Sequence, residues 1–124
     1  MISYENTKTV RDLVWNTGRE YAGRVFLRYE ENDVVYEVTY DEFAAQCRGV
    51  AAWLREQDAA VGHKVRVGLM GSSSHHYLVF LLGVMASGNV VVPLDVQLNE
   101  ETFADNVNRS DLDILFYDWD HYGK

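Results

Sequence analysis

Three apolar segments separated by two helix-like segments, all in the second half of the chain, restrict the fold more than any other feature of the sequence. The apolar segments read KVRVGLM, NVVVPLD and DILFYD. Each is a run with little alternation, which is typical of parallel strands that are covered on both faces. Parallel strands need a crossover connection, and that crossover is right-handed. We therefore predict that residues 63–124 form a β-α-β-α-β unit of the α/β class, with a doubly wound, mostly parallel sheet.

Pro93, the only proline in the chain, follows the valine run at residues 90–92. Proline has no amide hydrogen and cannot donate to a strand ladder. We expect residues 90–92 to form a buried strand and Pro93 to lie at its exit, where a lost donor costs little. The fixed φ of proline would then stiffen the turn into Leu94 and Asp95.

The first half of the chain predicts a helix, a β-hairpin and a second helix over residues 1–62. Thr9 is a candidate N-cap for the first helix, and Gly18 would end or weaken that helix. An amphipathic helix buries its apolar face. The apolar positions that fall near one face here are Val10, Leu13, Val14 and Tyr21.

The hairpin is predicted from two β-rich runs, residues 26–29 and 34–38, on either side of polar residues 31–33. Aromatic and β-branched residues favour strands, and the short polar segment between them favours a turn. Thr39 and Glu42 follow in the pattern of a capping box, in which each side chain bonds a backbone amide at the start of a helix. The sequence therefore places the second helix directly after the hairpin.

The second helix carries an apolar stripe with residues three or four positions apart, the spacing of one helical face: Phe43, Cys47, Val50 and Leu54. We interpret Cys47 as a core residue of this stripe rather than a nucleophile. It is the only cysteine, so no intrachain disulfide forms, which is typical of a reducing compartment and indicates the cytoplasm.

Composition and charge exclude several classes of partner. The chain has 124 residues, 48% hydrophobic and 24% charged, as expected for a globular domain. The formal net charge of -8 argues against a nucleic-acid partner and against an electrostatic membrane anchor. The longest apolar stretch, residues 77–88, is too short to span a bilayer, and the N-terminus lacks a signal-peptide pattern.

Three interpretations are open for the segment GSSSHH at residues 71–76. The favoured one is that its serines cap the following helix. The segment is also compatible with a phosphate site formed by amides at a helix N-terminus, and with a nucleophile–base pair of Ser73 or Ser74 with His76. The nucleophile elbow, the P-loop and the dinucleotide-binding glycine pattern are all absent, which disfavours the last two interpretations.

Metal and phosphoacceptor chemistry are also weakly supported. His75 and His76 are adjacent and would point to different sides of a helix, and no cysteine is spaced to complete a zinc site. Asp95 and Asp118 each follow a predicted strand, as in a magnesium-binding receiver domain. The adjacent acidic pair and the lysine of such a domain are missing, so we interpret these aspartates as loop residues.

The motifs, taken in order, resemble the start of the AMP-forming acyl-CoA synthetases, members of the adenylate-forming superfamily. VTYDEFAAQCRGVAAWL resembles the family's Thr-Tyr-x-Glu helix, and VGHKVRVGLM resembles its Gly-Asp-Arg-Val-Ala strand. SSSHHYLVFLLGVMASGNVVVPLD resembles its next helix with the strand Gly-x-Val-Val-Val-Pro-Leu. LNEETFADNVNRSDLDILFYD resembles the helix, turn and strand that follow, with Asn99 as the expected cap. The resemblance covers nearly the whole chain and is greatest to the long-chain fatty-acid–CoA ligases.

Four positions depart from the family pattern: His63, Lys64, Ser73 and Tyr77. The larger departure is that the family's phosphate-binding loop, adenine and magnesium motifs and catalytic lysine all come after the matched region. The resemblance therefore implies that residues 1–124 are a partial N-terminal domain, with residues 1–62 and 63–124 as its two segments. It implies no catalytic, cofactor-binding or metal-binding residue within the chain.

The resemblance also implies the chemistry of a parent enzyme. Such an enzyme adenylates a fatty acid with magnesium and ATP, releases pyrophosphate, and transfers the acyl group to coenzyme A. The partner of this segment would be the rest of the same polypeptide, and an incomplete sheet would make the isolated chain self-associate. Two alternatives are open: a self-contained α/β binding or signalling domain, and the start of a peptide-synthetase adenylation domain.

Overall fold

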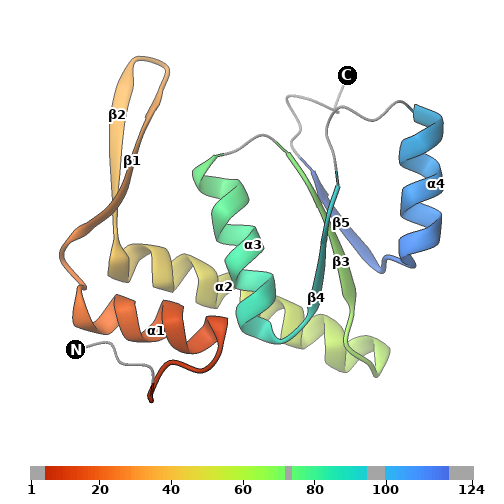
Figure 1. The fold of residues 1–124 in the computed structure, drawn as a ribbon, viewed down its shortest axis with the longest axis horizontal. Helices are drawn as coiled ribbons and strands as arrows, with labels where there is room; N and C mark the ends of the chain where they lie inside the picture. Colours follow the sequence, from red (N-terminus) through yellow and green to blue (C-terminus); the bar gives the residue numbers. More distant parts are fainter. Residues whose placement is uncertain (1–4, 72–73, 95–99, 118–124) are drawn as a thin grey trace.

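A helix and a β-hairpin precede a region of alternating helices and parallel strands (Figure 1). The computed structural model describes residues 5–71, 74–94 and 100–117. The elements, in chain order, are α1 (Val10–Glu20), β1 (Val25–Glu31), β2 (Val34–Thr39), α2 (Tyr40–Val61), β3 (Arg66–Met70), α3 (His75–Ser87), β4 (Val90–Pro93), α4 (Glu100–Ser110) and β5 (Ile114–Tyr117).

The parallel sheet has the strand order β4-β3-β5. The chain enters at the central strand β3, passes through α3 to β4 on one side, and returns through α4 to β5 on the other side. Crossovers of the same hand that run in opposite directions place their helices on opposite faces, and Figure 1 shows α3 and α4 on opposite sides of the sheet. The predicted doubly wound α/β class is confirmed.

Residues 90–92 form a parallel strand as predicted, but the prediction that this strand is buried is wrong. Among the described strands β4 pairs with β3 alone, and Val90 is 48% exposed. Pro93 lies within β4, opposite Leu69. The next amide, Leu94 N, donates to Leu69 O at 2.8 Å. Since successive amides of a strand point to opposite sides, the missing N–H of Pro93 falls on the outer side of β4, where its loss costs little.

Helix α1 begins as predicted at Thr9, whose side chain accepts from Asp12 N while the Asp12 carboxylate accepts from Thr9 N. Gly18 does not end the helix, which continues to Glu20. A Cβ atom on Gly18 would lie 2.6 Å from Cβ of Ala44, so this glycine permits close packing of α1 on α2. The buried face of α1 is therefore centred on Val14 and Gly18. Leu13, predicted on the buried face, is 45% exposed.

The hairpin has a tighter turn than predicted. Glu31 pairs with Val34 and belongs to β1, which leaves only Asn32 and Asp33 in the turn. Both have positive φ, 53° and 64°, as a type I′ turn requires, and asparagine and aspartate tolerate that conformation.

Helix α2 begins at the predicted capping box of Thr39 and Glu42 and ends at Gly62, which has a φ of 81°. Its stripe faces the core as predicted: Phe43, Cys47 and Leu54 are buried, and Val50 is half-buried. The buried residues form two clusters. The first is Val14, Val38, Phe43, Ala44, Cys47 and Val79; the second is Leu54, Val65, Val67 and Val84. Helices α2 and α3 contribute to both clusters and thereby join the hairpin half to the sheet.

None of the described helices combines the length and apolar character that a bilayer span requires.

Candidate functional site

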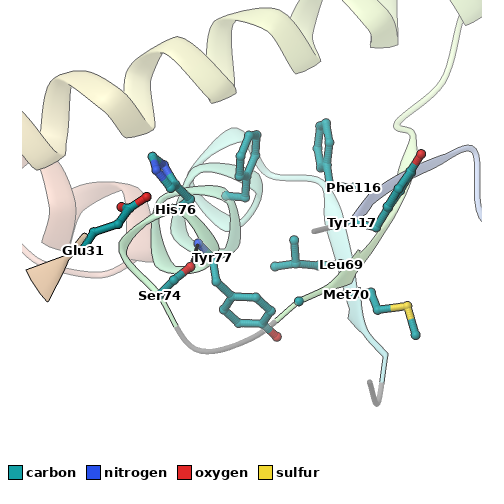
Figure 2. Close-up of a pocket in the computed structure, with 10 residues that line it drawn as sticks. Glu31, Leu69, Met70, Ser74, His76, Tyr77, Phe116 and Tyr117 are labelled. Atoms are coloured by element: carbon teal, nitrogen blue, oxygen red, sulfur yellow. Dashed lines mark hydrogen bonds between the residues drawn. The ribbon is translucent and has the colours of Figure 1, made fainter. Parts of the chain in front are cut away.

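A hollow of about 350 Å³ lies where the strand order of the sheet reverses. Doubly wound sheets bind ligands at this switch point, outside the carboxyl ends of the strands. Here the switch point lies between β3 and β5, and both strand ends line the hollow. Leu69 and Met70 come from β3, Gly71 directly follows it, and Phe116 and Tyr117 come from β5. Figure 2 shows the side chain of Leu69 pointing from β3 toward the start of α3, where Ser74, His76 and Tyr77 lie.

Aromatic rings form much of the wall of the hollow. Phe80 of α3 lies against Phe116, with ring centroids 4.7 Å apart, and Tyr77 and Tyr117 also line the space. The ring centroid of Trp53 of α2 lies 5.8 Å from that of Phe116. Polar groups on the wall come from Ser74 and His76 at the start of α3 and from Glu31 of the hairpin (Figure 2). The hollow is thus an apolar aromatic surface with a few polar groups.

Ser74 is the N-cap of α3, because its side chain accepts from Tyr77 N at 3.1 Å. The favoured interpretation of this serine is confirmed. Among the described residues no hydrogen bond joins Ser74 to His76, so the structure does not form the nucleophile–base pair weighed from the sequence. Ser73 lies outside the described residues, and the phosphate-site interpretation stays a prediction.

The two adjacent histidines differ in burial, although their ring centroids lie 5.0 Å apart. His75 is 7% exposed, whereas His76 is exposed and lines the hollow. No group of three or more metal-binding side chains gathers within the described ranges. The interpretations of Asp95, Asp118 and the cap Asn99 concern positions outside them.

Cys47 is fully buried, and its Sγ lies 3.8 Å from Val79 O. Burial raises the pKa of this thiol to about 12, although the nearby Arg48 charge acts in the opposite direction. A thiol with that pKa is protonated at neutral pH and is a poor nucleophile. The interpretation of Cys47 as a core residue is confirmed.

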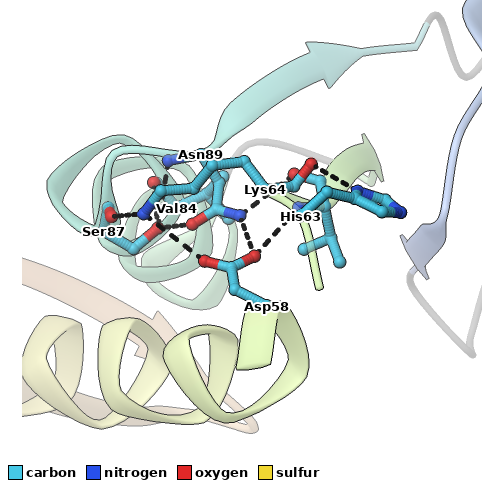
Figure 3. Close-up of polar contacts among 7 residues, drawn as sticks. Asp58, His63, Lys64, Val84, Ser87 and Asn89 are labelled. Atoms are coloured by element: carbon cyan, nitrogen blue, oxygen red, sulfur yellow. Dashed lines mark hydrogen bonds and ion pairs between the residues drawn. The ribbon is translucent and has the colours of Figure 1, made fainter. Parts of the chain in front are cut away.

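A polar cluster fastens the opposite end of the sheet, at the amino ends of the strands (Figure 3). Its centre is Asp58, near the end of α2. Asp58 Oδ1 accepts from Val65 N at 2.8 Å and from Asn89 Nδ2 at 2.7 Å. Asn89 Nδ2 also donates to Val65 O at 3.0 Å. Asp58 and Asn89 therefore join the end of α2, the residue before β3 and the residue before β4.

Lys64 and Ser87 complete the polar cluster. Lys64 Nζ lies 3.4 Å from Asp58 Oδ2 and donates to Ser87 O at 3.3 Å. Ser87 Oγ lies 2.7 Å from Asn89 Oδ1. Burial acts to raise the pKa of Asp58, but the hydrogen bonds from Val65 and Asn89 and the charge of Lys64 outweigh it, so the pKa is lowered. The cluster lies away from the hollow, and its role is to stabilise the fold.

Sequence reasoning missed Asp58 and Asn89. They are 31 residues apart and belong to no local motif. The one sequence signal was Lys64, which departs from the family pattern at the start of β3 and is the residue that faces the Asp58 carboxylate.

Comparison with known proteins decides the family. The family model described as "AMP-binding enzyme" matches residues 14–123. This chain belongs to the AMP-binding enzyme family. A mycosubtilin synthase protein of Bacillus subtilis is 29% identical over 112 residues, which cover 90% of this chain and 4% of that protein. The polyketide synthase-nonribosomal peptide synthetase phmA of Phaeosphaeria nodorum is 24% identical over 110 residues, or 89% of this chain and 3% of that protein.

Solved structures of two other proteins share the fold. The N-terminal subdomain of NpsA from Klebsiella oxytoca matches with a TM-score of 0.73 and 25% identity, covering 90% of this chain and 28% of that one. A fatty acid AMP ligase from Legionella pneumophila matches with a TM-score of 0.77 and 20% identity, covering 98% and 22%. The chain thus spans under a third of these structures and only a few per cent of the curated relatives. The predicted resemblance to an N-terminal portion of an adenylate-forming enzyme is confirmed at the level of the family.

Proposed function

We propose that this chain forms the N-terminal part of an AMP-forming ligase that activates a carboxylic acid, and that it shapes the larger domain without supplying catalytic groups. The family match over residues 14–123 carries the proposal. It is supported by the low coverage of the solved relatives, 28% and 22%. It is also supported by the polar cluster of Asp58 and Asn89, which stabilises the amino ends of the strands as a structural role requires.

The reaction of the whole enzyme follows from the chemistry of carboxylates. A carboxylate resists attack by a thiol because it is negatively charged and has no good leaving group. Attack of the carboxylate on ATP, with magnesium balancing the phosphate charge, would give an acyl-adenylate and pyrophosphate. A thiolate would then displace AMP and form a thioester. Within residues 1–124 we assign no catalytic, cofactor-binding or metal-binding residue to these steps.

For the substrate we propose a fatty acid, with coenzyme A as the thiol. The resemblance of TVRDLVWNTGREY and of the Val-Pro-Leu-Asp segment to long-chain fatty-acid–CoA ligases supports this choice. A second candidate is the adenylation domain of a peptide synthetase, which passes its acid to a carrier-protein thiol. The 29% identity to the mycosubtilin synthase protein favours that candidate. The cytoplasm is the proposed compartment, on the basis of the single thiol.

Carboxylate-dependent exchange of pyrophosphate into ATP tests the proposal. The 124-residue chain by itself should show no exchange, and a longer polypeptide that contains it should show exchange with fatty acids. Exchange catalysed by the chain alone would refute the scaffold role. The two candidate ligases are then distinguished by measuring whether the acyl group is transferred to coenzyme A or to a carrier protein. An open reading frame that stops after Lys124 would instead favour a self-contained α/β binding or signalling domain.

A further inference from the structure

Four aromatic rings form a column that links the hairpin to the start of α3. Tyr36 of β2 stacks on Tyr29 of β1, with centroids 5.2 Å apart and planes 17° apart. Tyr29 stacks in turn on His75 of α3, at 5.2 Å and 22°. His76 follows at 5.0 Å from His75. The contact between Tyr29 and His75 therefore joins the hairpin to the helix that lines the hollow.

His75 is held in its neutral form by its surroundings. Its ring Nε2 lies 2.7 Å from Gln46 Oε1. Because an amide oxygen only accepts, Nε2 carries the ring hydrogen. The other nitrogen, Nδ1, is buried and has no hydrogen-bond partner among the described residues. A second proton would thus place a hydrogen on a buried nitrogen that faces no acceptor in the part of the chain that the structure describes.

The described groups that surround His75 do not compensate a positive charge on it. Tyr29 faces it from the hairpin and Gln46 from α2, and neither is charged at neutral pH. Helix α1 meets α3 through apolar residues around Val14 and Val79. Burial, and after it the positive charge of His76, lower the pKa of His75 from its ordinary value of 6.5. The Glu31 carboxylate lines the hollow together with His76.

The hairpin is anchored mainly at its base. Tyr40 N donates to Arg24 O at 3.0 Å, and Asp41 N donates to Ala22 O at 3.2 Å. The hairpin extends away from this base, as Figure 1 shows, and its tip residues Val34 and Val35 are exposed. The outer part can therefore swing on the base once the contact between Tyr29 and His75 is lost. Glu31, which lines the hollow, would move with it.

We propose that the stack of Tyr29 on His75 is an acid-sensitive latch, in which protonation of His75 releases the outer part of the hairpin from α3 and widens the hollow at the switch point. The neutral histidine is the closed state, held by the Gln46 hydrogen bond and the ring stack. The protonated ring leaves this buried position for water. The contribution of neutral His75 to the stability of the closed state is fully present above the ordinary histidine pKa of 6.5. It is lost as the pH falls from there through the lowered pKa of the folded state.

Amide hydrogen exchange of the 124-residue chain, followed by mass spectrometry and corrected for the intrinsic effect of pH, tests the latch. Between about pH 7.5 and about pH 5.5, exchange in β1 and β2 should rise by up to about tenfold per pH unit, because one proton is linked to opening. Exchange in β3 should stay constant. His75→Phe keeps a stacking ring that cannot titrate and should abolish the response. His76→Gln removes the neighbouring positive charge and should move the response to higher pH.

Three results would overturn the latch. The first is hairpin exchange in the unaltered chain that is independent of pH or unprotected at every pH. The second is a response that persists unchanged in His75→Phe. The third is a pH midpoint of hairpin exchange that does not move in His76→Gln. This result decides if His75→Phe loses the protection of β3, because that variant is then unfolded and cannot be interpreted.

Discussion

Gly83 of α3 faces Val50 of α2 so closely that a Cβ atom on Gly83 would lie 2.7 Å from Cβ of Val50 and 2.9 Å from its Cγ1. Cys47 O would lie 3.3 Å away. Because the nearest contact is a β-carbon next to the backbone rather than the end of a flexible chain, the two helices would have to separate to admit a methyl group. This spacing sets the distance between the helices that join the two halves of the fold.

Gly83→Ala should therefore destabilise the chain by about 1–3 kcal/mol, the usual cost of overpacking a filled core. Urea unfolding followed by circular dichroism measures the change. Gly49→Ala is the matched control, since Gly49 lies within α2 with no atom within 4 Å of an added Cβ. That variant should be up to about 1 kcal/mol more stable, because alanine has the higher helix propensity. Equal effects of the two substitutions would contradict the close packing.

Asn89→Ala should cost about 2–3 kcal/mol or more in the free energy of unfolding, because it leaves buried partners without hydrogen bonds. The amide of Asn89 satisfies Asp58 Oδ1 and Val65 O at once. Asn106→Ala on α4 serves as a comparison outside the polar cluster and should have a smaller effect. If Asn89→Ala lowered the free energy of unfolding no more than Asn106→Ala, the polar cluster would not stabilise the sheet.

Asp58 should make the stability of the chain depend on acid pH. Its folded-state pKa is lowered from 3.8, so its stabilising contribution is present above that value and is lost as the pH falls below it. Asp58→Asn removes this titration, and the variant should lose less stability than the unaltered chain between about pH 5 and about pH 3. Asp105→Asn, at an exposed ion pair with Arg109, is the control. Identical acid sensitivity in all three chains would refute the assignment.

Several features of this fold could be predicted from the sequence because their causes are local. The capping box of Thr39 and Glu42 lies within four residues, and the stripe around Cys47 repeats with the period of the helix. Leu13 was placed wrongly because α1 turns its Val14 side to α2, where Gly18 permits close approach to Ala44. That choice of face depends on a contact with a distant residue rather than on the pattern of α1 itself.

The candidate site was less accessible to prediction. The hollow is assembled from β1, β3, α3 and β5, so its residues meet only through the order of the strands. The apolar run of β4 indicated a buried strand, but its exposure depends on which strands flank it. An edge strand and a central strand of a parallel sheet have the same apolar composition, and the pattern alone does not separate them.

The thiol of Cys47 should be almost inert in the folded chain. Since burial raises its pKa from 9.0 to about 12, the thiolate fraction at neutral pH falls by roughly a thousandfold. A chromogenic disulfide reagent should react far more slowly with the native chain than with the chain in concentrated urea. Equal rates in the two conditions would mean that Cys47 is accessible and that the α2–α3 core is open.

The isolated chain should self-associate through the outer edges of its sheet. Among the described strands, β4 and β5 each pair only with β3, and Val90 and Tyr117 are both 48% exposed. Light scattering over a range of concentrations measures the association. Val90→Lys places a charge on the edge and should reduce it, whereas Val61→Lys, at an exposed apolar residue of α2, should not. A monomer at every concentration would contradict the expectation.

Substitutions at the two ends of the sheet should differ in how strongly they affect the stability of the fold. Substitutions at the amino ends would disturb the hydrogen bonds of Asp58 and Asn89 and would thereby lower the stability of the fold. Substitutions around the hollow change exposed or half-buried aromatic and polar groups, which carry less of the stability. Such a separation lets the lining vary while the scaffold persists. A division of this kind is what one fold needs if it is to support several functions.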